Sequence, residues 1–133
     1  MNMPFNQLTV EERRVMLQKG TEAPFQGEFD DLFVPGTFIC RQCHTPLFSS
    51  KAKFEAHCGW PAFDTTFPEA VIETPDTDGK RTEISCSHCS GHLGHVFRGE
   101  LLTQKDTRHC VNSLSLRFIR EGDPFPPVLL NAL

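Results

Sequence analysis

The sequence predicts a mainly β domain with one short helix near its N-terminus. Two observations support this fold class: short candidate strands between turns follow one another from residue 37 onward, and a helix-capping signature precedes them. The chain has 133 residues, of which 38% are hydrophobic and 23% are charged. These are values of one globular domain, and a chain of this length can bury a core without disulfide bonds. We therefore expect a single domain over residues 1–133.

The helix is expected directly after Thr9. The Thr9 hydroxyl can cap the first turn, Glu12 three residues later completes a capping box, and Gly20 marks the stop. Proline and glycine interrupt the segment 20–35, which is predicted to be an extended connection. Residues 1–36 thus form a helix and a lead-in to the β structure.

Five short strands, paired in an antiparallel manner, are predicted after this lead-in. The last one alternates Leu114, Leu116 and Phe118 with polar neighbours, which is the pattern of a half-buried strand. The candidate segments are TFIC at 37–40, AVIE at 70–73, RTEIS at 81–85, HVFR at 95–98 and SLSLRFI at 113–119.

Two further segments are predicted to be irregular. The segment TPDTDGK at 74–80 has the composition of a turn, with Asp78-Gly79 as its hairpin-type dipeptide. The tail at 120–133 carries three of the ten prolines and cannot begin with a regular element.

The charge balance and the hydropathy pattern exclude several classes of partner. A net charge of −4, with lysine and arginine scattered along the chain, argues against nucleic acid, because phosphate binding usually requires a basic face. No stretch approaches the roughly 20 apolar residues of a membrane span. The N-terminal residues lack a basic region followed by an apolar run, which is the pattern of a secretory signal. We therefore expect a cytoplasmic protein with neither a nucleic acid nor a membrane as its partner.

Four of the six cysteines lie in two Cys-x-x-Cys pairs, and each pair follows a candidate strand. Two such pairs supply tetrahedral thiolate ligation to one zinc ion, with bonds of about 2.3 Å. The 42 residues between Cys43 and Cys86 exceed the roughly 15–20 of a compact zinc ribbon, so a folded insertion is expected between the pairs. Four thiolates leave no open position for water, which predicts a structural Zn²⁺. The predicted ligands are Cys40, Cys43, Cys86 and Cys89.

Two alternatives to zinc ligation stay open for these four cysteines. Each pair is also the motif of a thioredoxin-like redox site, although neither lies in the βαβ context that this motif requires. In the second alternative, the four are buried cysteines without a ligand.

Zinc leaves Cys58 and Cys110 for other chemistry. A reactive cysteine needs a lowered pKa, which cationic neighbours provide, and Arg108 and His109 directly precede Cys110. Cys110 is therefore the better candidate nucleophile. Neighbours on a strand point to opposite faces, so His109 need not assist Cys110. The alternative is that both cysteines are structural. Trp60, the only tryptophan, lies two residues after Cys58.

Two histidines three residues apart, His92 and His95, alternate with glycines in GHLGH. Histidine is the side chain best suited to donate a proton near neutral pH, which makes both candidates for acid catalysis. Metal ligation and an ordinary surface position are the alternatives, and the four thiolates already complete a metal site.

Together, these segments resemble the methionine-R-sulfoxide reductase B family from about Leu8 to Ile119. The blocks CGWPAF, GHLGHVF and RHCVNS occur in the family's order around two zinc knuckles, and this combination is specific. The resemblance implies two antiparallel β-sheets, a short N-terminal helix and a structural zinc site. The segments that carry it are GTEAPFQG, CRQCHTPLFSS, KFEAHCGWPAF, RTEISCSHCSGHLGHVF and RHCVNSLSLRF.

The resemblance also implies an activity, that of a peptide-methionine (R)-S-oxide reductase repairing oxidised methionine. Cys110 would attack the sulfoxide and become a sulfenic acid, and Cys58 would resolve it as a Cys58–Cys110 disulfide. An external dithiol such as thioredoxin would then reduce this disulfide. The other implied site residues are His92, His95 and Asn112 around the sulfoxide, Trp60 against the substrate's methyl group, and Arg108 before the nucleophile.

Two departures from the family pattern stand out. His109 occupies a position that is usually aromatic, and the segment Arg98–Lys105 lacks the acidic residue and the proline expected after HVF. Glu100 is a candidate to replace that acidic residue as the partner of Arg108. These changes are expected to affect loop geometry, substrate preference and rate rather than the class of reaction.

Two functions of other classes remain as rivals. A zinc-stabilised binding module accounts for the four ligands, but it does not require the set Cys58, His92, His95, Cys110 and Asn112. A thiol redox sensor, in which a Cys58–Cys110 disulfide changes binding, would not need Trp60.

Overall fold

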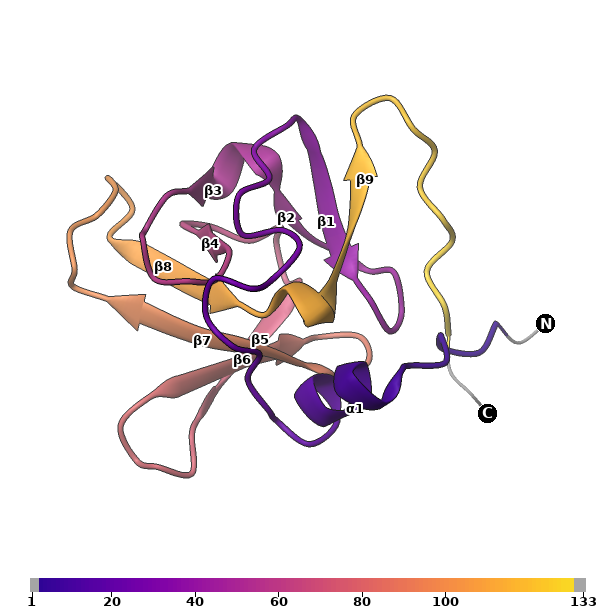
Figure 1. The fold of residues 1–133 in the computed structure, drawn as a ribbon, viewed down its shortest axis with the longest axis horizontal. Helices are drawn as coiled ribbons and strands as arrows, with labels where there is room; N and C mark the ends of the chain where they lie inside the picture. The colour runs from indigo at the N-terminus through magenta and orange to yellow at the C-terminus, as the bar shows by residue number, and fades with distance from the viewer. Residues whose placement is uncertain (1–2, 131–133) are drawn as a thin grey trace.

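Nine strands form two antiparallel sheets, as the computed structural model shows for residues 3–130 (Figure 1). The fold class predicted from the sequence is therefore confirmed. The three-stranded sheet has the order β2-β1-β9 and consists of β1 (Gly36–Cys40), β2 (Pro46–Ser49) and β9 (Leu116–Arg120). The six-stranded sheet has the order β3-β4-β8-β7-β6-β5 and consists of β3 (Lys53–Phe54), β4 (Ala62–Phe63), β5 (Val71–Pro75), β6 (Thr82–Cys86), β7 (His92–Arg98) and β8 (Thr107–Val111).

The one α-helix of the described residues, α1 (Val10–Met16), begins as its capping signature predicts. The Thr9 hydroxyl accepts a hydrogen bond from the Glu12 N–H at 3.1 Å, and the Glu12 carboxylate accepts one from the Thr9 N–H at 2.9 Å. The helix ends at Met16, earlier than the predicted stop at Gly20. The Gly20 N–H instead donates to the Arg14 carbonyl, which closes the turn that follows the helix.

The strand predicted at 113–119 is wrong in its first half. Residues Ser113–Ser115 form a 3₁₀-helix, η2, and β9 begins only at Leu116. The polar side chains account for the difference, because the Ser115 hydroxyl donates to the His92 carbonyl and the Ser113 hydroxyl accepts from the Phe29 N–H. These hydrogen bonds to distant segments hold the two serine side chains in the 3₁₀ turn.

Several short elements escaped prediction from the sequence. The most important is β8, which lies between β4 and β7 and carries Cys110. Its sequence, TRHCV, lacks the hydrophobic run that marks a central strand, and its place is decided by pairing with its neighbours. The other elements missed are β2, β3, β4 and a 3₁₀-helix, η1 (Ser50–Ala52).

The hydrophobic core lies between the two sheets, and a cluster of phenylalanine rings joins one sheet to the other. Phe48 of the small sheet stacks on Phe63 of the large one with ring centroids 4.3 Å apart, and Phe38 meets Phe63 edge to face at 5.2 Å. All three side chains are fully buried. Each such side chain contributes roughly 1.5–3 kcal/mol through burial, so this cluster is a main source of the attraction between the sheets.

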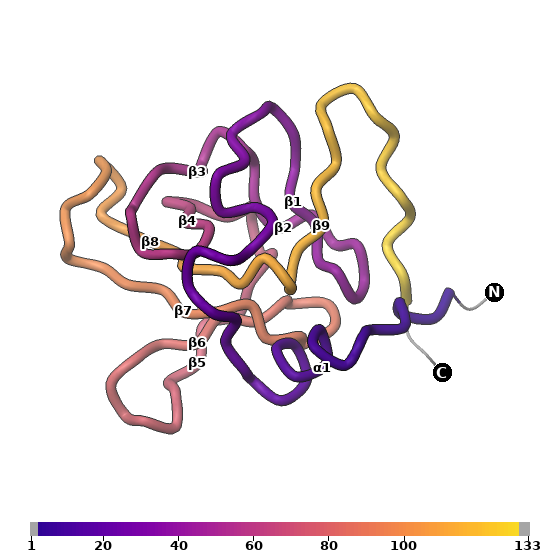
Figure 2. The backbone as a smooth tube through the Cα atoms, viewed as in Figure 1, coloured from indigo at the N-terminus to yellow at the C-terminus, as the bar shows by residue number. Residues whose placement is uncertain are grey.

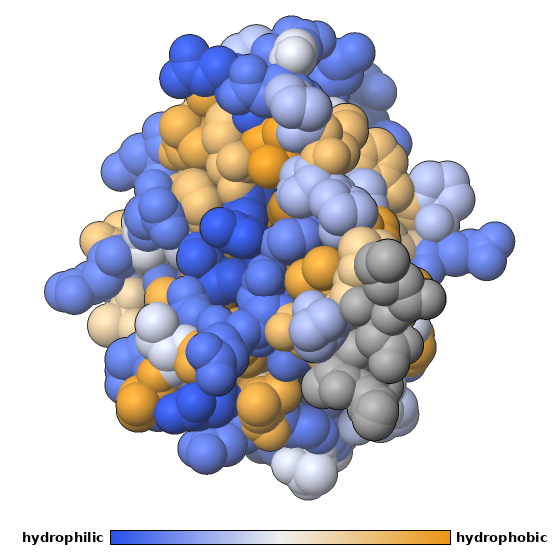
Figure 3. All heavy atoms as spheres, turned by 90° about the vertical axis from the view of Figure 1, so that its right-hand side faces the viewer, coloured by the Kyte–Doolittle hydropathy of each residue, from blue (hydrophilic) through white to orange (hydrophobic). Residues whose placement is uncertain are grey.

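The C-terminal segment returns along the outside of the molecule without regular structure, as predicted. The Leu129 N–H donates to the Cys43 carbonyl, and the Leu130 N–H donates to the Met3 carbonyl at 2.8 Å, so the two ends of the described chain lie side by side (Figure 2). The last part of the predicted tail, 131–133, lies outside the described residues. Figure 3 faces this side of the molecule and shows hydrophobic surface gathered in its upper half. Within residues 3–130, no helix combines the length and apolar character needed to cross a membrane.

Candidate active site and metal centre

Four cysteine sulfurs converge at the ends of β1 and β6, as the two Cys-x-x-Cys pairs predict. All four lie within 4.8 Å of one another, with Sγ–Sγ distances of 3.5 Å for Cys40–Cys89 and 3.6 Å for Cys43–Cys86. A tetrahedron with Zn–S bonds of about 2.3 Å has edges of about 3.8 Å. The spacing and the all-sulfur donor set therefore fit a structural zinc ion.

The two halves of this metal centre share one backbone geometry. In each, the N–H four residues after the first cysteine donates to that cysteine's carbonyl at 2.8 Å, from His44 to Cys40 and from Ser90 to Cys86. His44 and Ser90 both adopt a left-handed conformation, with φ of 72° and 66°. The repeated turn brings both thiolates of a pair to the same side.

The position of the metal centre indicates its structural role. Cys40 ends β1 in the small sheet, whereas Cys86 ends β6 in the large sheet. A bound ion would therefore tie the two sheets together at one end of the core.

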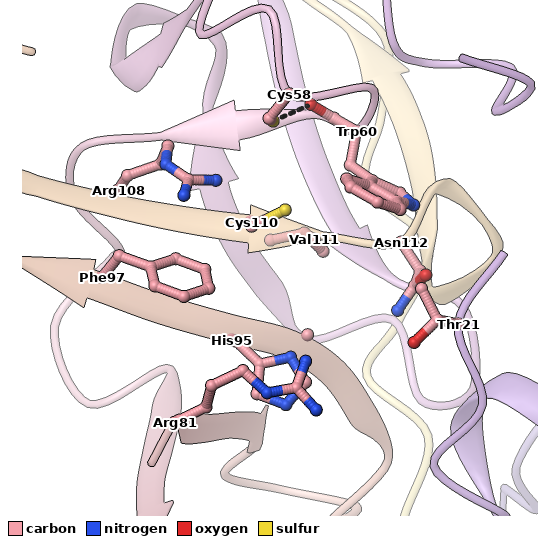
Figure 4. Close-up of a pocket in the computed structure, with 11 residues that line it drawn as sticks. Thr21, Cys58, Trp60, Arg81, His95, Phe97, Arg108, Cys110, Val111 and Asn112 are labelled. Atoms are coloured by element: carbon pink, nitrogen blue, oxygen red, sulfur yellow. Dashed lines mark hydrogen bonds between the residues drawn. The ribbon is translucent and has the colours of Figure 1, made fainter. Parts of the chain in front are cut away.

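A second site lies on the large sheet, where a cavity of about 190 Å³ opens beside β7 and β8 (Figure 4). It contains both cysteines that zinc does not need. The lining residues are Thr21, Cys58, Trp60, Arg81, Gly94, His95, Phe97, Arg108, Cys110, Val111 and Asn112. Six of the seven side chains predicted for the active site thus share this cavity, and His92 is the exception.

Strand alternation decides which neighbours of Cys110 face the cavity. Arg108 and Cys110 lie on the cavity side of β8. His109 is on the opposite side, where its Nδ1–H donates to the Phe63 carbonyl at 3.0 Å and its ring packs near Phe48. Burial lowers the pKa of His109, which keeps it neutral at neutral pH. His109 is a core residue and does not assist the thiol beside it.

A β-bulge brings His92 and His95 together. Residues three apart on a regular strand point to opposite faces. Here the register between β6 and β7 shifts, because Ile84 pairs with Gly94 while Ser85 pairs with His92. The extra residue, Leu93, returns both histidines to the same face, and their rings lie 5.6 Å apart.

Each histidine is held by a carboxylate from the β5–β6 hairpin. Asp76 Oδ2 lies 2.6 Å from His95 Nε2, and Glu83 Oε2 lies 2.7 Å from His92 Nδ1. Glu83 is also bound by the Lys19 ammonium at 3.0 Å. His92 is buried behind the cavity, and burial lowers its pKa. His95 is thus the histidine that a ligand in the cavity meets.

Cys58 sits in a tight loop between two left-handed residues, His57 with φ of 56° and Gly59 with φ of 94°. Its S–H donates to the Trp60 carbonyl at 3.3 Å (Figure 4). The Phe25 N–H donates to the Gly59 carbonyl at 2.7 Å, so the lead-in segment fastens this loop from outside. The compact turn places the Cys58 thiol at the same cavity as Cys110.

The two thiols titrate as a pair. Interaction with Cys110, aided by Arg108, lowers the pKa of Cys58 to about 6, and interaction with Cys58 together with burial raises the pKa of Cys110. Near neutral pH the pair therefore carries one negative charge. Cys58 is the stronger acid of the pair, and Cys110 becomes the thiolate when its proton passes to Cys58, whose S–H then donates to the Trp60 carbonyl.

Glu100 is the partner of Arg108. The Arg108 Nε–H donates to Glu100 Oε1 at 2.8 Å, and Nη2–H donates to Oε2 at 3.1 Å. The guanidinium also lies over the Phe97 ring, 4.3 Å from its centroid. The departure at 98–105 therefore keeps an acidic partner for Arg108, and it is the residue expected from the sequence. Asp106 closes this loop by accepting hydrogen bonds from two of its backbone N–H groups.

Asn112 and Trp60 are oriented through Glu22. The Glu22 N–H donates to Asn112 Oδ1, and the Glu22 carbonyl accepts from Trp60 Nε1–H, both at 3.0 Å. Asn112 Nδ2 donates to the Leu93 carbonyl, so its buried amide is held at both ends. Burial raises the pKa of the Glu22 carboxyl group, which accepts from the Leu114 N–H.

Sequence reasoning missed several residues of this site, and four of them bear on its chemistry. Thr21, Arg81 and Phe97 line the cavity, and Asp76 binds His95 from the turn that the sequence marked only as irregular. Arg81 and Asp76 lie at the same hairpin tip. Its composition predicts a turn, but nothing in the sequence predicts which part of the molecule the tip packs against. Phe97 could have been found, because it lies two residues after His95 on the same strand face.

Comparison with known proteins agrees with this arrangement. The SelR domain model matches residues 8–120. The chain is 54% identical over 112 residues to peptide methionine sulfoxide reductase B5 of Arabidopsis thaliana, covering 84% of this chain and 81% of that protein. It is 55% identical over 113 residues to the chloroplastic peptide methionine sulfoxide reductase B3 of Oryza sativa subsp. japonica, covering 84% and 49%, respectively.

A third relative is the chloroplastic peptide methionine sulfoxide reductase B2 of Arabidopsis thaliana, which is 52% identical over 116 residues. That match covers 86% of this chain and 57% of the relative. The chain thus spans about half the length of the two chloroplastic relatives, and most of the length of the B5 protein.

Proposed function

Since the chain belongs to the SelR-domain family, with the peptide methionine sulfoxide reductases B among its relatives, we propose that it reduces methionine-R-sulfoxide to methionine. It is a peptide-methionine (R)-S-oxide reductase, and residues 8–120 match the SelR domain. The observation that carries this proposal is the meeting of Cys58, Cys110 and His95 at one cavity.

The first step is attack of the Cys110 thiolate on the sulfoxide sulfur. Arg108 and the second thiol keep one negative charge on the pair at neutral pH, and this charge reaches Cys110 when the Cys110 proton passes to Cys58. The S–O bond of the substrate breaks, and methionine leaves with two more electrons than the sulfoxide had. The oxygen remains on Cys110 as a sulfenic acid.

The sulfoxide oxygen gains negative charge during this attack and needs a proton. His95 lines the cavity and donates it, whereas His92 lies behind and supports the strand face. A general acid of this kind contributes roughly 10²–10⁴-fold. Asn112 closes the same side of the cavity, with its amide fixed by Glu22 and Leu93.

Trp60 selects the substrate by its methyl group. Its indole N–H is bound to the Glu22 carbonyl, so the flat ring presents a fixed apolar wall to the cavity (Figure 4). A ring held at one angle accepts the methyl group from one epimer of the sulfoxide. Arg81, opposite Cys110, offers its guanidinium to a carbonyl group of the substrate main chain.

Recycling uses the second cysteine. The Cys58 sulfur attacks the Cys110 sulfenic acid, the S–S bond forms, and the oxygen leaves as water. A dithiol protein of the thioredoxin type then reduces the disulfide by exchange through a mixed disulfide. Cys58 and Cys110 are both partly exposed, so a reductant can reach the disulfide from the cavity.

Single-turnover assays with separated R and S epimers test the proposal, using the free amino acid and a short peptide without added reductant. We expect methionine from the R epimer only, with one Cys58–Cys110 disulfide formed per methionine and detected by mass spectrometry. If the folded, zinc-containing protein yields methionine from neither epimer, the proposed reductase activity is wrong and a binding module is favoured. A disulfide formed by peroxide, without any methionine product, would instead favour a redox sensor.

A further inference from the structure

The tip of the β5–β6 hairpin does more than connect two strands, because it folds onto the wall of the cavity. Asp76, at its start, lies with Oδ2 2.6 Å from His95 Nε2, and Arg81, at its end, lines the cavity beside the same ring (Figure 4). The Asp76 side chain is only 15% exposed. Its carboxylate is therefore directed at the histidine and away from solvent.

The tip is built to hold Asp76 in this place. The Asp76 N–H donates to the Arg81 carbonyl, and Oδ1 accepts from the Thr77 N–H at 2.6 Å. The Asp78 carboxylate binds Arg81 by accepting a hydrogen bond from its Nε–H at 2.8 Å. With Oδ1 occupied by the Thr77 N–H, Oδ2 of Asp76 meets His95 at 2.6 Å, while Arg81 Nη2 lies farther from the same oxygen, at 3.7 Å.

This contact decides which ring nitrogen of His95 can act on a ligand. The Nε2–H donates to Asp76, so Nδ1 is the nitrogen that remains. In a neutral ring with this tautomer, Nδ1 carries a lone pair and cannot donate. Only the doubly protonated ring has a proton on Nδ1, and an adjacent carboxylate stabilises that charged form.

We propose that Asp76 is a positioning residue that holds His95 with Nε2 protonated and stabilises the charged ring whose Nδ1–H protonates the substrate oxygen. The catalytic part of this inference rests on the proposed reductase activity. Asp76 itself touches neither the substrate nor either thiol, and it acts through His95.

The charges around His95 explain why its doubly protonated ring needs the Asp76 carboxylate beside it. Arg81 opposes a second positive charge on the ring, and among residues 3–130 Asp76 is the only carboxylate hydrogen-bonded to His95. Glu83 is the strand partner of His95, but its carboxylate binds His92 and Lys19. The titratable and charged groups that face His95 are Asp76 and Arg81 from the hairpin tip, His92 from β7, Arg108 and Cys110 from β8, and Cys58 from its loop.

Two variants separate orientation from charge. Asp76→Asn keeps an oxygen that accepts from Nε2–H and removes the charge, whereas Asp76→Ala removes both. The matched control is Glu73→Gln, which removes a carboxylate from the same hairpin that binds Arg98 and lies outside the cavity. Single-turnover reduction of a methionine-R-sulfoxide peptide is then measured between pH 6 and pH 9, together with substrate affinity.

We expect Asp76→Asn to be slower than the wild type by about 10–100-fold at pH 8, with the difference shrinking as the pH falls. Substrate affinity should change by less than about threefold, because the lost effect belongs to the transition state. Glu73→Gln should follow the wild-type profile. A rate ratio that stays constant across the pH range would overturn the inference.

A readout independent of activity examines the contact itself. Nitrogen-15 NMR of the histidine rings should show the Nε2–H tautomer for neutral His95 in the wild type and in Asp76→Asn, and a mixture of tautomers in Asp76→Ala. Finding neutral His95 as the Nδ1–H tautomer in the wild type would contradict the inference. If the wild type reduces neither epimer, the proposed activity fails, while this spectrum still decides whether Asp76 sets the tautomer.

Discussion

The α-carbon of Gly94 lies directly against the carbonyl oxygen of Cys110 on the adjacent strand, with no room for a β-carbon between them. Gly94 pairs with Val111, and the following residue, His95, pairs with Cys110. A glycine at this point thus lets β7 approach β8 closely enough to place the histidine and the thiol at the same cavity. This glycine in GHLGH is therefore required by the close packing of β7 against β8.

Gly94→Ala should separate these strands and reduce activity. The added methyl group would overlap the Cys110 carbonyl, a backbone group that cannot turn away, so we expect a loss of about 1–3 kcal/mol in unfolding free energy. Single-turnover reduction should fall more than tenfold, because displacements of about 1 Å cost that much in catalysis. Chemical denaturation and the epimer assay measure both effects. Gly122→Asn, at an exposed position with open space around it, is the control, and equal losses in both variants would contradict a specific role for the close approach at Gly94.

The roles of Cys58 and Cys110 should be distinguishable by the catalytic step at which each mutant stops. Cys110→Ser removes the nucleophile and should abolish methionine formation altogether. Cys58→Ser should form up to one methionine per chain and accumulate a sulfenic acid that dimedone traps, because the resolving sulfur is missing. Mass spectrometry of the trapped peptide gives the answer. Equal thioredoxin-linked turnover of Cys58→Ser and the wild type would remove Cys58 from the cycle.

Alkylation of the cavity thiols should depend on pH through the lowered pKa of the pair. Interaction with Cys110 and with Arg108 lowers the pKa of Cys58 to about 6, so the reactive thiolate is present above pH 6 and is lost as the pH falls through that value. Arg108→Gln removes the cation and should move the midpoint of iodoacetamide alkylation to higher pH. Arg98→Gln is the matched control, because Arg98 binds Glu73 through both carboxylate oxygens as Arg108 binds Glu100, yet lies outside the cavity. A midpoint shared by both variants would argue against a role for Arg108.

Removal of zinc should unfold the protein rather than merely inactivate it. The binding free energy of a structural zinc site is about 10–16 kcal/mol, which is comparable to the whole stability of a domain of this size. A zinc ion held by Cys40 and Cys86 would also join the two sheets. We expect one zinc per chain, and loss of near-ultraviolet circular dichroism and of the thermal transition after chelation or in Cys89→Ser. Cys58→Ser should keep its zinc and its transition, and a chelated protein that still melts cooperatively near the original temperature would refute the structural role.

Features carried by neighbouring residues could be read from the sequence. The capping box of Thr9 and Glu12 starts the helix where expected, because both hydrogen bonds close within four residues. The two Cys-x-x-Cys pairs form matching turns for the same reason. The ion pair of Glu100 with Arg108 could also be expected, since both flank one loop.

The tertiary structure decided what depends on contacts between distant segments. The bulge at Leu93 turns His92 and His95 to one face only because β7 is paired with β6, and nothing in the spacing of the histidines reveals it. Strand β8 exists because β4 and β7 bond both of its edges, although three of its five residues, Thr107, Arg108 and His109, are polar. In the same way, a turn signal at Asp76 states that the chain reverses, but only packing of the hairpin tip brings its carboxylate to His95. The sequence by itself determined which groups could do chemistry, and pairing across the sheet, whose energy comes from residues far apart in the chain, decided which of them meet.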